Sequence, residues 1–500
     1  MKTRKVVFFF PAFSSQEATA PLGILAVATP LLRAGYQVQL IDSTITPNFE
    51  QTVLRELADA LCLAVSLVTG PMIRETVQMA RKAKALYPEL PVILGGWHPS
   101  LLPGQTLAAE FVDIVVQGQG EDAMLEILQH IEDGASMKGI AGVGYKEDGR
   151  LVFNPPRKLK PISELPPKAY QLADFDAYER ACGRRWAMYT SSLACPYNCA
   201  YCTNAGVYGR GWNGLGPVQV AEETVDLATR YNLNLLWIVD DNFLVDRARA
   251  LGIAEELIRR DAKFEWSIQA STNLVDRFTV DELKLLRRSG LSQVQQGADS
   301  GSRHVLDLMN KQFQKLDHIY AAADKLHQAG IRPAFNMIFG YPGEREEDRI
   351  ASVRMIMDIC RRYPGAEFWT NIFTPYPGSP VMERAFELGI KVPEKLEEWS
   401  DFFPRYTELP WLKGDRHERV QTMREYLRMA FERVPVSIRR RDRLTRAAHA
   451  LLAAPARWRL DHGVYGWPFE IWLNSAARKV FRPLKPKIDP NLLEDKAVTC

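Results

Sequence analysis

One stretch near the middle of the chain decides how the rest is interpreted, and it reads Leu193-Ala194-Cys195-Pro196-Tyr197-Asn198-Cys199-Ala200-Tyr201-Cys202-Thr203. It places three thiols at CxxxCxxC spacing, directly after an apolar run that predicts a β-strand. Three thiolates on one tight loop can hold three irons of a cubane cluster and leave the fourth iron open. The alternatives are a three-cysteine zinc site and three unrelated buried cysteines. Zinc normally takes a fourth protein ligand, however, and no Cys or His follows until His304. The spacing therefore predicts a [4Fe–4S] cluster on Cys195, Cys199 and Cys202.

Apolar runs alternate with helical patterns around this stretch, from residue 185 to residue 377. The strand candidates are 186–191, 235–240, 264–270, 293–298, 334–339 and 367–373, and helical patterns cover 218–230, 279–289, 316–328 and 346–362. Six such units predict a partial (β/α)6 barrel of the TIM type, whose functional face lies at the carboxyl ends of its strands. The cysteine stretch follows the first of these strands.

The first 135 residues show a second alternation of strands and helices. Strand candidates are 6–10, 38–42, 61–67, 92–95 and 113–117, and helical patterns cover 22–34, 49–60, 71–87 and 121–132. This α/β pattern predicts a doubly wound, Rossmann-like parallel sheet, in which ligands bind beyond the carboxyl ends of the strands. A hairpin and a proline-rich linker follow, and the end of the chain is mostly helical. We therefore expect domains at 1–135, 136–185, 186–385 and 386–500.

Composition limits the class of protein. A chain of 500 residues exceeds what one hydrophobic core supports, and a net charge of +3 excludes a chain-wide nucleic-acid footprint. Seven cysteines, three of them close together, favour a metal site over disulfides and hence a reducing cytoplasm. We expect no secretory signal and no transmembrane helix, since the N-terminal apolar stretch is short and no long apolar run follows.

The segment 436–485 is basic and aromatic. It has eleven Lys or Arg residues against three acidic ones, and interleaved with them are Trp458, Tyr465, Trp467, Phe469 and Trp472. We predict a helical cap whose aromatic side chains pack on the barrel and whose arginines are solvated, because charge runs are usually solvated faces. Peripheral contact with an anionic membrane surface is the alternative.

The CxxxC-aromatic-C pattern resembles the signature of radical S-adenosylmethionine (SAM) enzymes. The resemblance implies that the open iron binds the amino and carboxylate groups of SAM. It also implies that an external one-electron reductant starts cleavage of SAM to a 5′-deoxyadenosyl radical, which takes hydrogen from a small-molecule substrate. Segments 237–243, 295–302, 337–344 and 374–379 resemble further strand-end motifs of this family, in the family's order. The implied SAM contacts are Tyr201, Asp240, Asp241, Asn242, Ser271, Asp299, Ser300, Ile338 and Gly340.

Two of these positions depart from the family pattern. Asp299 stands where Glu is usual. The third strand ends in 269–273 where many relatives carry an Arg, so either Ser271 or Asn273 takes over that contact or the contact is lost. For Asp240 and Asp241 the structural alternative is a helix N-cap.

The N-terminal domain resembles the cobalamin-binding domain that is fused to one branch of this superfamily, on segments 22–24, 32–36, 95–99 and 117–121. The DxHxxG motif, which supplies a histidine to cobalt, is absent after the first strand, where Pro11-Ala12-Phe13-Ser14 stands instead. We therefore expect cobalamin without a protein histidine on cobalt, and His98 at a helix start or on the surface. Strand-end glycines are also common turn residues, so a cleft without cofactor is the alternative. The implied cobalamin contacts are Ser66, Thr69, Gly95, Gly96, Gly118 and Gly120.

Together these features resemble the branch that includes C-methyltransferases and the anaerobic magnesium-protoporphyrin monomethyl ester cyclase. The implied cofactors are a [4Fe–4S] cluster, SAM and cobalamin, and no side chain beyond the cofactor ligands is given a catalytic role. We expect methylation of an unactivated carbon in a small molecule, with a lipid or isoprenoid-like substrate compatible with the basic segment, and no nucleic-acid partner. Radical cyclisation or rearrangement is one alternative, and a non-catalytic iron–sulfur electron carrier or redox sensor is another.

Overall fold

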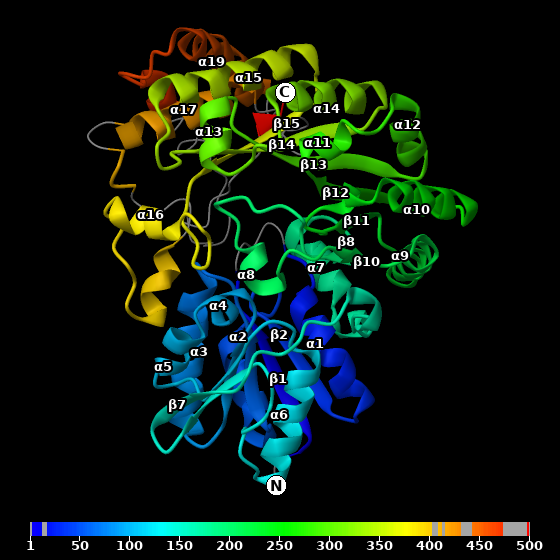
Figure 1. The fold of residues 1–500 in the computed structure, drawn as a ribbon, viewed down its shortest axis with the longest axis vertical. Coiled ribbons are helices and arrows are strands. Elements are labelled where there is room, and N and C mark those ends of the chain that lie inside the picture. Colours follow the sequence, from blue (N-terminus) through cyan, green and yellow to red (C-terminus); the bar gives the residue numbers. More distant parts are fainter. Residues whose placement is uncertain are drawn as a thin grey trace. The chain divides into compact units, whose positions relative to one another are not determined.

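The computed structural model describes residues 3–12, 18–402, 409–412, 416–431, 443–473 and 498–499 (Figure 1). The chain forms two compact units. The first comprises residues 1–241, 374–386 and 391–407, and the second comprises residues 242–373, 387–390 and 408–500. Segments far along the sequence therefore return to the first unit.

The first unit contains a seven-stranded sheet of order β2-β1-β3-β4-β5-β6-β7. The first five strands are parallel, and the order reverses between β1 and β3, which marks the switch point where such sheets bind ligands. Its strands are β1 (Lys5–Phe10), β2 (Gln37–Asp42), β3 (Cys62–Ser66), β4 (Val92–Gly95), β5 (Ile114–Val116), β6 (Val143–Glu147) and β7 (Arg150–Phe153). Its helices are α1 (Leu22–Arg33), α2 (Phe49–Glu56), α3 (Met72–Leu86), α4 (Trp97–Leu101), α5 (Pro103–Ala108) and α6 (Glu121–Asp133).

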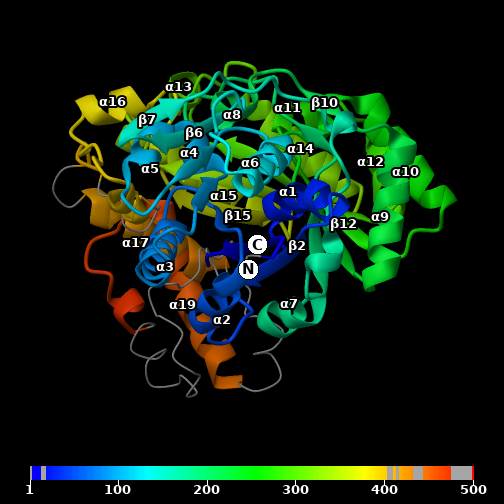
Figure 2. The ribbon, with the colours of Figure 1, turned by 90° about the horizontal axis from the view of Figure 1, so that it is seen from below.

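Helices cover both faces of this sheet, as Figure 2 shows from below. On one face α2 and α3 pack over Val7 and Phe9 of β1. On the other face α1 and α6 pack over Val6 and Phe8. Because both faces are buried, the strand is a continuous apolar run instead of an alternating one. The predicted doubly wound fold is confirmed.

The hairpin predicted after residue 135 is part of this sheet. β6 pairs antiparallel with β5, and β7 pairs antiparallel with β6. An antiparallel hairpin needs no crossover helix, so the βα alternation stops at residue 135 although the sheet continues to Phe153.

The rest of the first unit carries the cysteine stretch. β8 and β11 pair in parallel, and the short strands β9 and β10 pair antiparallel. The elements are α7 (Phe175–Cys182), β8 (Trp186–Tyr189), β9 (Ser192–Leu193), α8 (Asn204–Tyr208), β10 (Asn213–Gly214), α9 (Pro217–Tyr231), β11 (Leu235–Ile238), α16 (Met382–Glu387) and the 3-10 helix η6 (Leu396–Asp401).

In the second unit β12, β13, β14 and β15 pair in parallel, and β16 pairs antiparallel with β15. The strands are β12 (Glu265–Ala270), β13 (Leu291–Asp299), β14 (Arg332–Phe339), β15 (Glu367–Ile372) and β16 (Val498–Thr499). The helices are α10 (Arg247–Arg259), α11 (Thr272–Val275), α12 (Val280–Arg288), α13 (Arg303–Leu308), α14 (Leu316–Gln328), α15 (Glu346–Arg362), α17 (Arg416–Phe431) and α19 (Arg443–His462). With β8 and β11, these strands provide the six predicted βα units.

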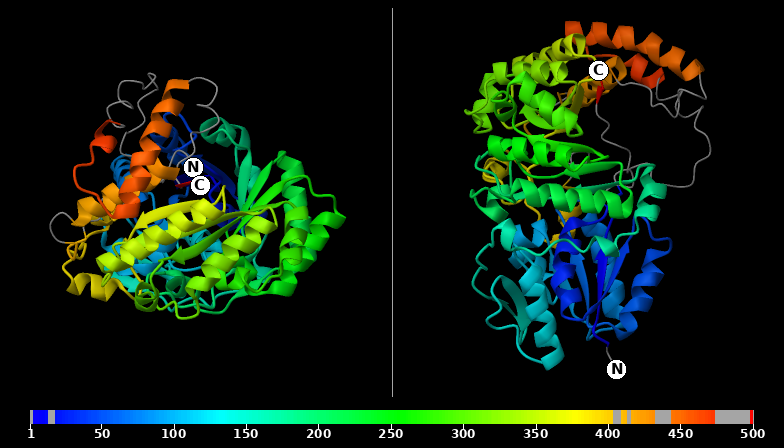
Figure 3. Two further views of the ribbon diagram at one scale, coloured as in Figure 1. Left: turned by 90° about the horizontal axis from the view of Figure 1, so that it is seen from above. Right: turned by 90° about the vertical axis from the view of Figure 1, so that its right-hand side faces the viewer.

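The helices α17 and α19 pack side by side, in orange tones in Figure 3. Of the basic segment 436–485, residues 436–442 and 474–485 lie outside the described residues. The prediction that its aromatic side chains pack on the barrel is wrong for Trp458, Trp467, Phe469 and Trp472, all of which are exposed. Within the described part of the chain, no helix is both long and apolar enough to cross a membrane.

Candidate active site

A cavity of about 980 Å³ opens in the first unit beside the carboxyl ends of its parallel strands. This volume is near the top of the ~300–1,000 Å³ range of cofactor and ligand sites. Of the six predicted cobalamin contacts, five line it, namely Ser66, Gly95, Gly96, Gly118 and Gly120. The sequence therefore located this cavity well.

Two adjacent glycines in the lining have different physical roles. Gly96 has a φ of +95°, and a Cβ there would lie 2.7 Å from the carbonyl oxygen of Leu67. The backbone requires glycine at that position. A Cβ on Gly95 would meet nothing nearer than the Cβ of Val116, at 3.8 Å. Gly95 is thus not required by the backbone, and its missing side chain leaves room in the cavity.

Thr69, the sixth predicted contact, does not line this cavity. It is buried, and its Oγ1 lies 2.9 Å from Nδ1 of His98. His98 is the second residue of α4, so the expected helix-start position is confirmed, whereas the alternative surface position is wrong because the side chain is fully buried. It is covered by Trp399, whose ring centroid lies 5.8 Å from the imidazole. Burial lowers the pKa of His98 to about 4, so the ring is neutral. No histidine of the described residues lines the cavity.

Charged side chains reach the cavity as well, and no sequence motif marked them. The Nζ of Lys168 lies 5.7 Å from the ring centroid of Tyr189, whose hydroxyl donates to Glu223 at 2.6 Å. Burial lowers the pKa of Lys168, and the charges of Glu223, Asp240 and Glu121 oppose this shift. A half-buried lysine near several carboxylates is typical of a ligand site.

The same cavity is bordered by residues that flank the cysteine motif. Ser192 and Leu193 precede the motif, Tyr208 follows it, and Asp241 comes just after β11. One cavity therefore joins the predicted cobalamin contacts to a predicted SAM contact.

The three cysteines lie on the loop between β9 and α8. They are half-buried, and so is Tyr201. The loop begins at Ala194, which has a φ of +65°, and the amide of Val381 donates to the carbonyl of Ala200 at 2.9 Å. Among the described residues, no three side chains of metal-binding type already converge on one point. The assignment of Cys195, Cys199 and Cys202 to the cluster therefore depends on their spacing and chemistry.

The two aspartates after β11 have separate environments. Asp240 is buried, and it accepts from the amide and hydroxyl of Ser191, both at 2.6 Å, and from the hydroxyl of Ser192 at 2.7 Å. Both of its oxygens are thus occupied by the chain itself. Asp241 faces the cavity and accepts from Nδ2 of Asn204. Asp241 is exposed to the cavity, and desolvation by the surrounding walls, aided by the charge of Asp240, raises its pKa to about 6 against the opposing bond from Asn204.

In the second unit, Asn242 and Ser271 are brought together. The Nδ2 of Asn242 donates to the hydroxyl of Ser271 at 2.8 Å, and the amide of Ser271 donates to Oδ1 of Asn242 at 3.2 Å. Asp299 has a φ of +63° and forms a buried ion pair with Lys311, whose Nζ also donates to the carbonyl of Gly297 at 2.8 Å. The lysine occupies the carboxylate that the resemblance assigned to SAM.

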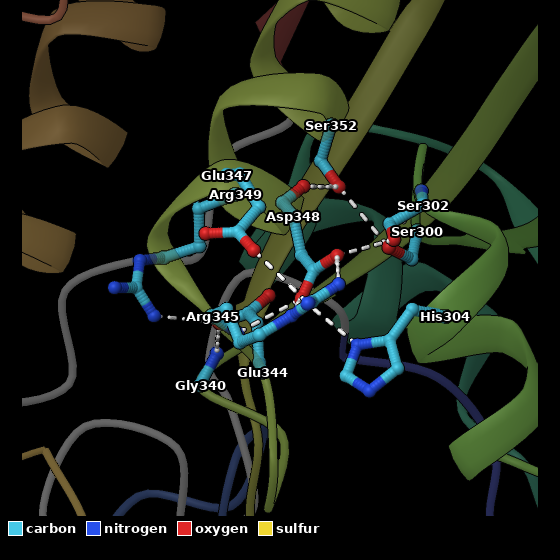
Figure 4. Close-up of polar contacts among 10 residues, drawn as sticks. All are labelled: Ser300, Ser302, His304, Gly340, Glu344, Arg345, Glu347, Asp348, Arg349 and Ser352. Atoms are coloured by element: carbon cyan, nitrogen blue, oxygen red, sulfur yellow. Dashed lines mark hydrogen bonds and ion pairs between the residues drawn. The ribbon is translucent and has the colours of Figure 1, made fainter.

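Ser300 belongs to a polar network shown in Figure 4. Its hydroxyl lies 3.1 Å from that of Ser352. Nearby, Asp348 accepts from the hydroxyl of Ser302 at 2.6 Å and contacts Nδ1 of His304 at 3.0 Å. Burial alone would raise the pKa of Asp348, but these hydrogen bonds and those from Arg345 hold it well below its usual range. The network fixes the chain that follows β13.

Glu344 connects this network to the end of β14. Its Oε2 accepts from the amide of Gly340 at 2.7 Å and from Nη1 of Arg349 at 3.2 Å. Burial raises the pKa of Glu344 to about 7, despite Arg349 and the Gly340 amide. Glu344 closes the segment 337–344, but no feature of the sequence marks it as a site residue.

The predicted contacts on β14 lie beside a covering segment. Ile338 is half-buried, and the indole of Trp411 donates to the carbonyl of Gly340 at 2.9 Å. A Cβ on Gly340, whose φ is +80°, would lie 2.7 Å from Leu409. Residues 409–412 therefore pack directly on this strand end.

Known protein families match both halves of this arrangement. Residues 189–356 match the radical SAM superfamily, and residues 12–128 match the B12 binding domain. The chain is 27% identical over 399 residues to an uncharacterized methyltransferase of Pyrococcus horikoshii, with 77% of this chain and 84% of that protein covered. It is 25% identical over 434 residues to the anaerobic magnesium-protoporphyrin IX monomethyl ester cyclase of Rubrivivax gelatinosus, with 83% and 74% covered.

Among solved structures, the fold is similar to that of the radical SAM methyltransferase TsrM from Kitasatospora setae, determined with cobalamin and a [4Fe–4S] cluster. The TM-score is 0.65 at 19% identity, with 79% of this chain and 76% of that chain covered. The resemblances drawn from the sequence motifs are thereby confirmed. The chain therefore carries a B12 binding domain over residues 12–128 and a radical SAM superfamily domain over residues 189–356.

Proposed function

We propose that this protein is a cobalamin-dependent radical SAM methyltransferase that acts on an unactivated carbon of a small molecule. The shared cavity carries the proposal. Ser66 and Gly95, from the B12-binding part, border the same space as Asp241, which follows β11. Methyl transfer requires the methyl carrier and the activated substrate carbon to come within contact distance, and one shared cavity provides this proximity.

The residues present suit the three cofactors. Three half-buried thiols on one loop are a donor set for an iron–sulfur cluster, and Gly96 lets backbone line the large cavity at close range. When bound, the cluster and SAM supply radical chemistry and cobalamin supplies a transferable methyl group. We assign the cluster to Cys195, Cys199 and Cys202.

The chain's own residues bind and orient. Ionised Asp241 would accept hydrogen bonds from the amino group of SAM, and Asn204 holds its carboxylate in place. Asp240, whose oxygens are occupied by Ser191 and Ser192, holds the strand ends together. It is thus a positioning residue and not a ligand of SAM.

Product analysis of the anaerobically reconstituted enzyme tests this proposal. Methylation at an unactivated carbon consumes two SAM molecules, one as methyl donor and one as radical source. We therefore expect S-adenosylhomocysteine and 5′-deoxyadenosine in equal amounts, and label from methyl-deuterated SAM in the product. 5′-Deoxyadenosine without S-adenosylhomocysteine would contradict methylation.

The second candidate is radical cyclisation, which the 25% identity to the magnesium-protoporphyrin cyclase favours. That outcome gives 5′-deoxyadenosine and an unlabelled product. An iron–sulfur electron carrier or sensor would cleave no SAM at all after reduction. An external one-electron reductant and a lipid or isoprenoid-like substrate remain parts of this proposal.

A further inference from the structure

The end of the described chain displays an unusual number of exposed apolar side chains. Among the described residues, seven of the fourteen large hydrophobic side chains that are exposed lie within residues 451–473. They are Leu451, Trp458, Val464, Trp467, Phe469, Trp472 and Leu473, and we call them the aromatic surface. Trp467 is 84% exposed, Trp472 58% and Trp458 55%. A cluster of this kind marks an interaction site, because single exposed apolar residues are common and clusters are not.

On α19 these side chains follow helical spacing. Leu451 and Trp458 are seven residues apart, and His462 stacks on Trp458 with ring centroids 4.6 Å apart. Residues seven and eleven apart share one helix face. The opposite face is buried through Ala456, Arg459 and Leu460. The helix is therefore amphipathic, with part of its apolar area facing outward.

The turn after α19 is held rigidly. Arg459 is buried and pairs with Glu470 at 2.7 Å, while its guanidinium donates to the carbonyls of Gly466 at 2.7 Å and Trp467 at 3.0 Å. Tyr426 of α17 donates to the second oxygen of Glu470 at 2.9 Å. Burying charged groups costs free energy, because they lose their hydration. A network of this kind therefore indicates that the shape of this turn matters.

Within this turn Trp467 has a φ of +51°. Bulky residues rarely adopt that conformation, and strained positions of this kind gather at functional sites. The network therefore holds Trp467 outward in a fixed position. An indole presented in this way is suited to an interface with one apolar and one wet side.

Charge identifies the occupant. Residues 436–485 carry eleven Lys or Arg against Asp442, Asp461 and Glu470, and seven of the eleven lie outside the described residues. Asp461 pairs with Arg361 at 2.9 Å and Glu470 pairs with Arg459, so two of the acidic side chains and one of the eleven basic ones are neutralised internally. The net positive charge complements a negatively charged surface. Tryptophans among basic residues are typical of the boundary between lipid headgroups and acyl chains.

We propose that the aromatic surface docks this protein on an anionic phospholipid bilayer, with Trp467 and Trp472 inserted at the headgroup level. No helix of the described residues spans the bilayer, so the contact is peripheral. This inference is independent of the reaction catalysed.

The test is co-sedimentation of the full-length protein with vesicles of phosphatidylcholine alone and of phosphatidylcholine mixed with phosphatidylglycerol. We expect binding to the anionic vesicles, weakened by high salt, with a blue shift of tryptophan fluorescence. In the variant W458S/W467S/W472S the apparent affinity for anionic vesicles should fall at least about tenfold. The matched control is Leu86→Ser, since Leu86 is 58% exposed on α3 of the other unit.

Two results would overturn the proposal. One is the absence of wild-type binding to anionic vesicles, and the other is unchanged binding of the triple variant. Light scattering adds a separate arm. If the wild type self-associates through this surface and the triple variant does not, the occupant is a second copy of the chain and not a bilayer. Far-UV circular dichroism checks the fold, and the exposed positions should leave it unchanged.

Discussion

Replacing Gly95 by leucine separates the cofactor site from the fold that surrounds it. Gly95 lines the large cavity, and a Cβ there would have no neighbour closer than 3.8 Å. Gly95→Ala should therefore be nearly neutral for folding. Gly95→Leu should also fold, because the longer side chain extends into open space. Cobalamin would then compete for that space with a side chain.

The expected magnitude follows from packing energetics. Forcing extra methylene groups into an occupied site costs about 1–3 kcal/mol. At 1.4 kcal/mol per tenfold, the Kd for cobalamin should rise about 5- to 150-fold. The neighbouring position should behave differently, because Gly96 has a φ of +95° and a Cβ there would lie 2.7 Å from a backbone oxygen. Gly96→Ala should therefore destabilise the fold itself, by about 1–3 kcal/mol, because its φ of 95° and ψ of −163° are adopted almost only by glycine.

The assay is equilibrium dialysis of each variant with hydroxocobalamin, read by absorbance, together with thermal unfolding of the same samples. We expect Gly95→Leu to keep the wild-type Tm and lose affinity, and Gly96→Ala to lose Tm. If Gly95→Leu binds cobalamin as tightly as the wild type, the cavity is not the cobalamin site. If the wild type binds none, the B12-binding part is a scaffold without cofactor.

Three further variants test the remaining site assignments. Cys199→Ala should abolish the broad iron–sulfur absorbance of reconstituted protein, whereas Cys182→Ala, outside the motif, should retain it. Equal absorbance spectra of the two variants would refute the cluster assignment. Because the pKa of Asp241 is raised to about 6, its carboxylate is neutral below that pH, so SAM binding measured by calorimetry should strengthen as pH rises through 6. Asp241→Asn should remove this dependence, and a wild-type affinity independent of pH would exclude the residue. Lys311→Met leaves a buried carboxylate unpaired and should lower the free energy of unfolding in urea by about 3–5 kcal/mol, against about 0–1 kcal/mol for the exposed pair of Lys284. If breaking the exposed pair of Lys284 lowered the free energy of unfolding as much as Lys311→Met does, the buried pair would contribute no more than an exposed one.

Local patterns were sufficient for the architecture. Alternating strand and helix signals predict a parallel sheet, because each helix returns the chain to the end of the sheet at which the previous strand began. The predicted strands therefore agree with β1 to β5 and with the six βα strands, within a few residues. Glycines at strand ends also marked the cavity, since Gly95, Gly96 and Gly118 all line it.

Side-chain partners were not predictable in the same way. Asp240 and Asp241 are adjacent in sequence and chemically identical, yet one is bonded to two serines and the other faces the cavity. His98 lies at the start of α4 as expected, but its burial was not predictable, because its cover, Trp399, comes about 300 residues later in the chain. No local signal encodes such a contact.

The sequence by itself determined which chemistry the protein carries and in what order its βα units run, because thiol spacing and hydrophobic periodicity are local properties of the chain. The tertiary structure alone decided which of the predicted polar groups remain available to a ligand. In the folded chain Asp299 is paired with Lys311 and Thr69 is hydrogen-bonded to His98, whereas Asp241 faces the cavity. A buried polar group must be hydrogen-bonded, and its partner comes from whichever segment packs nearest in space, so availability is settled only when the chain has folded.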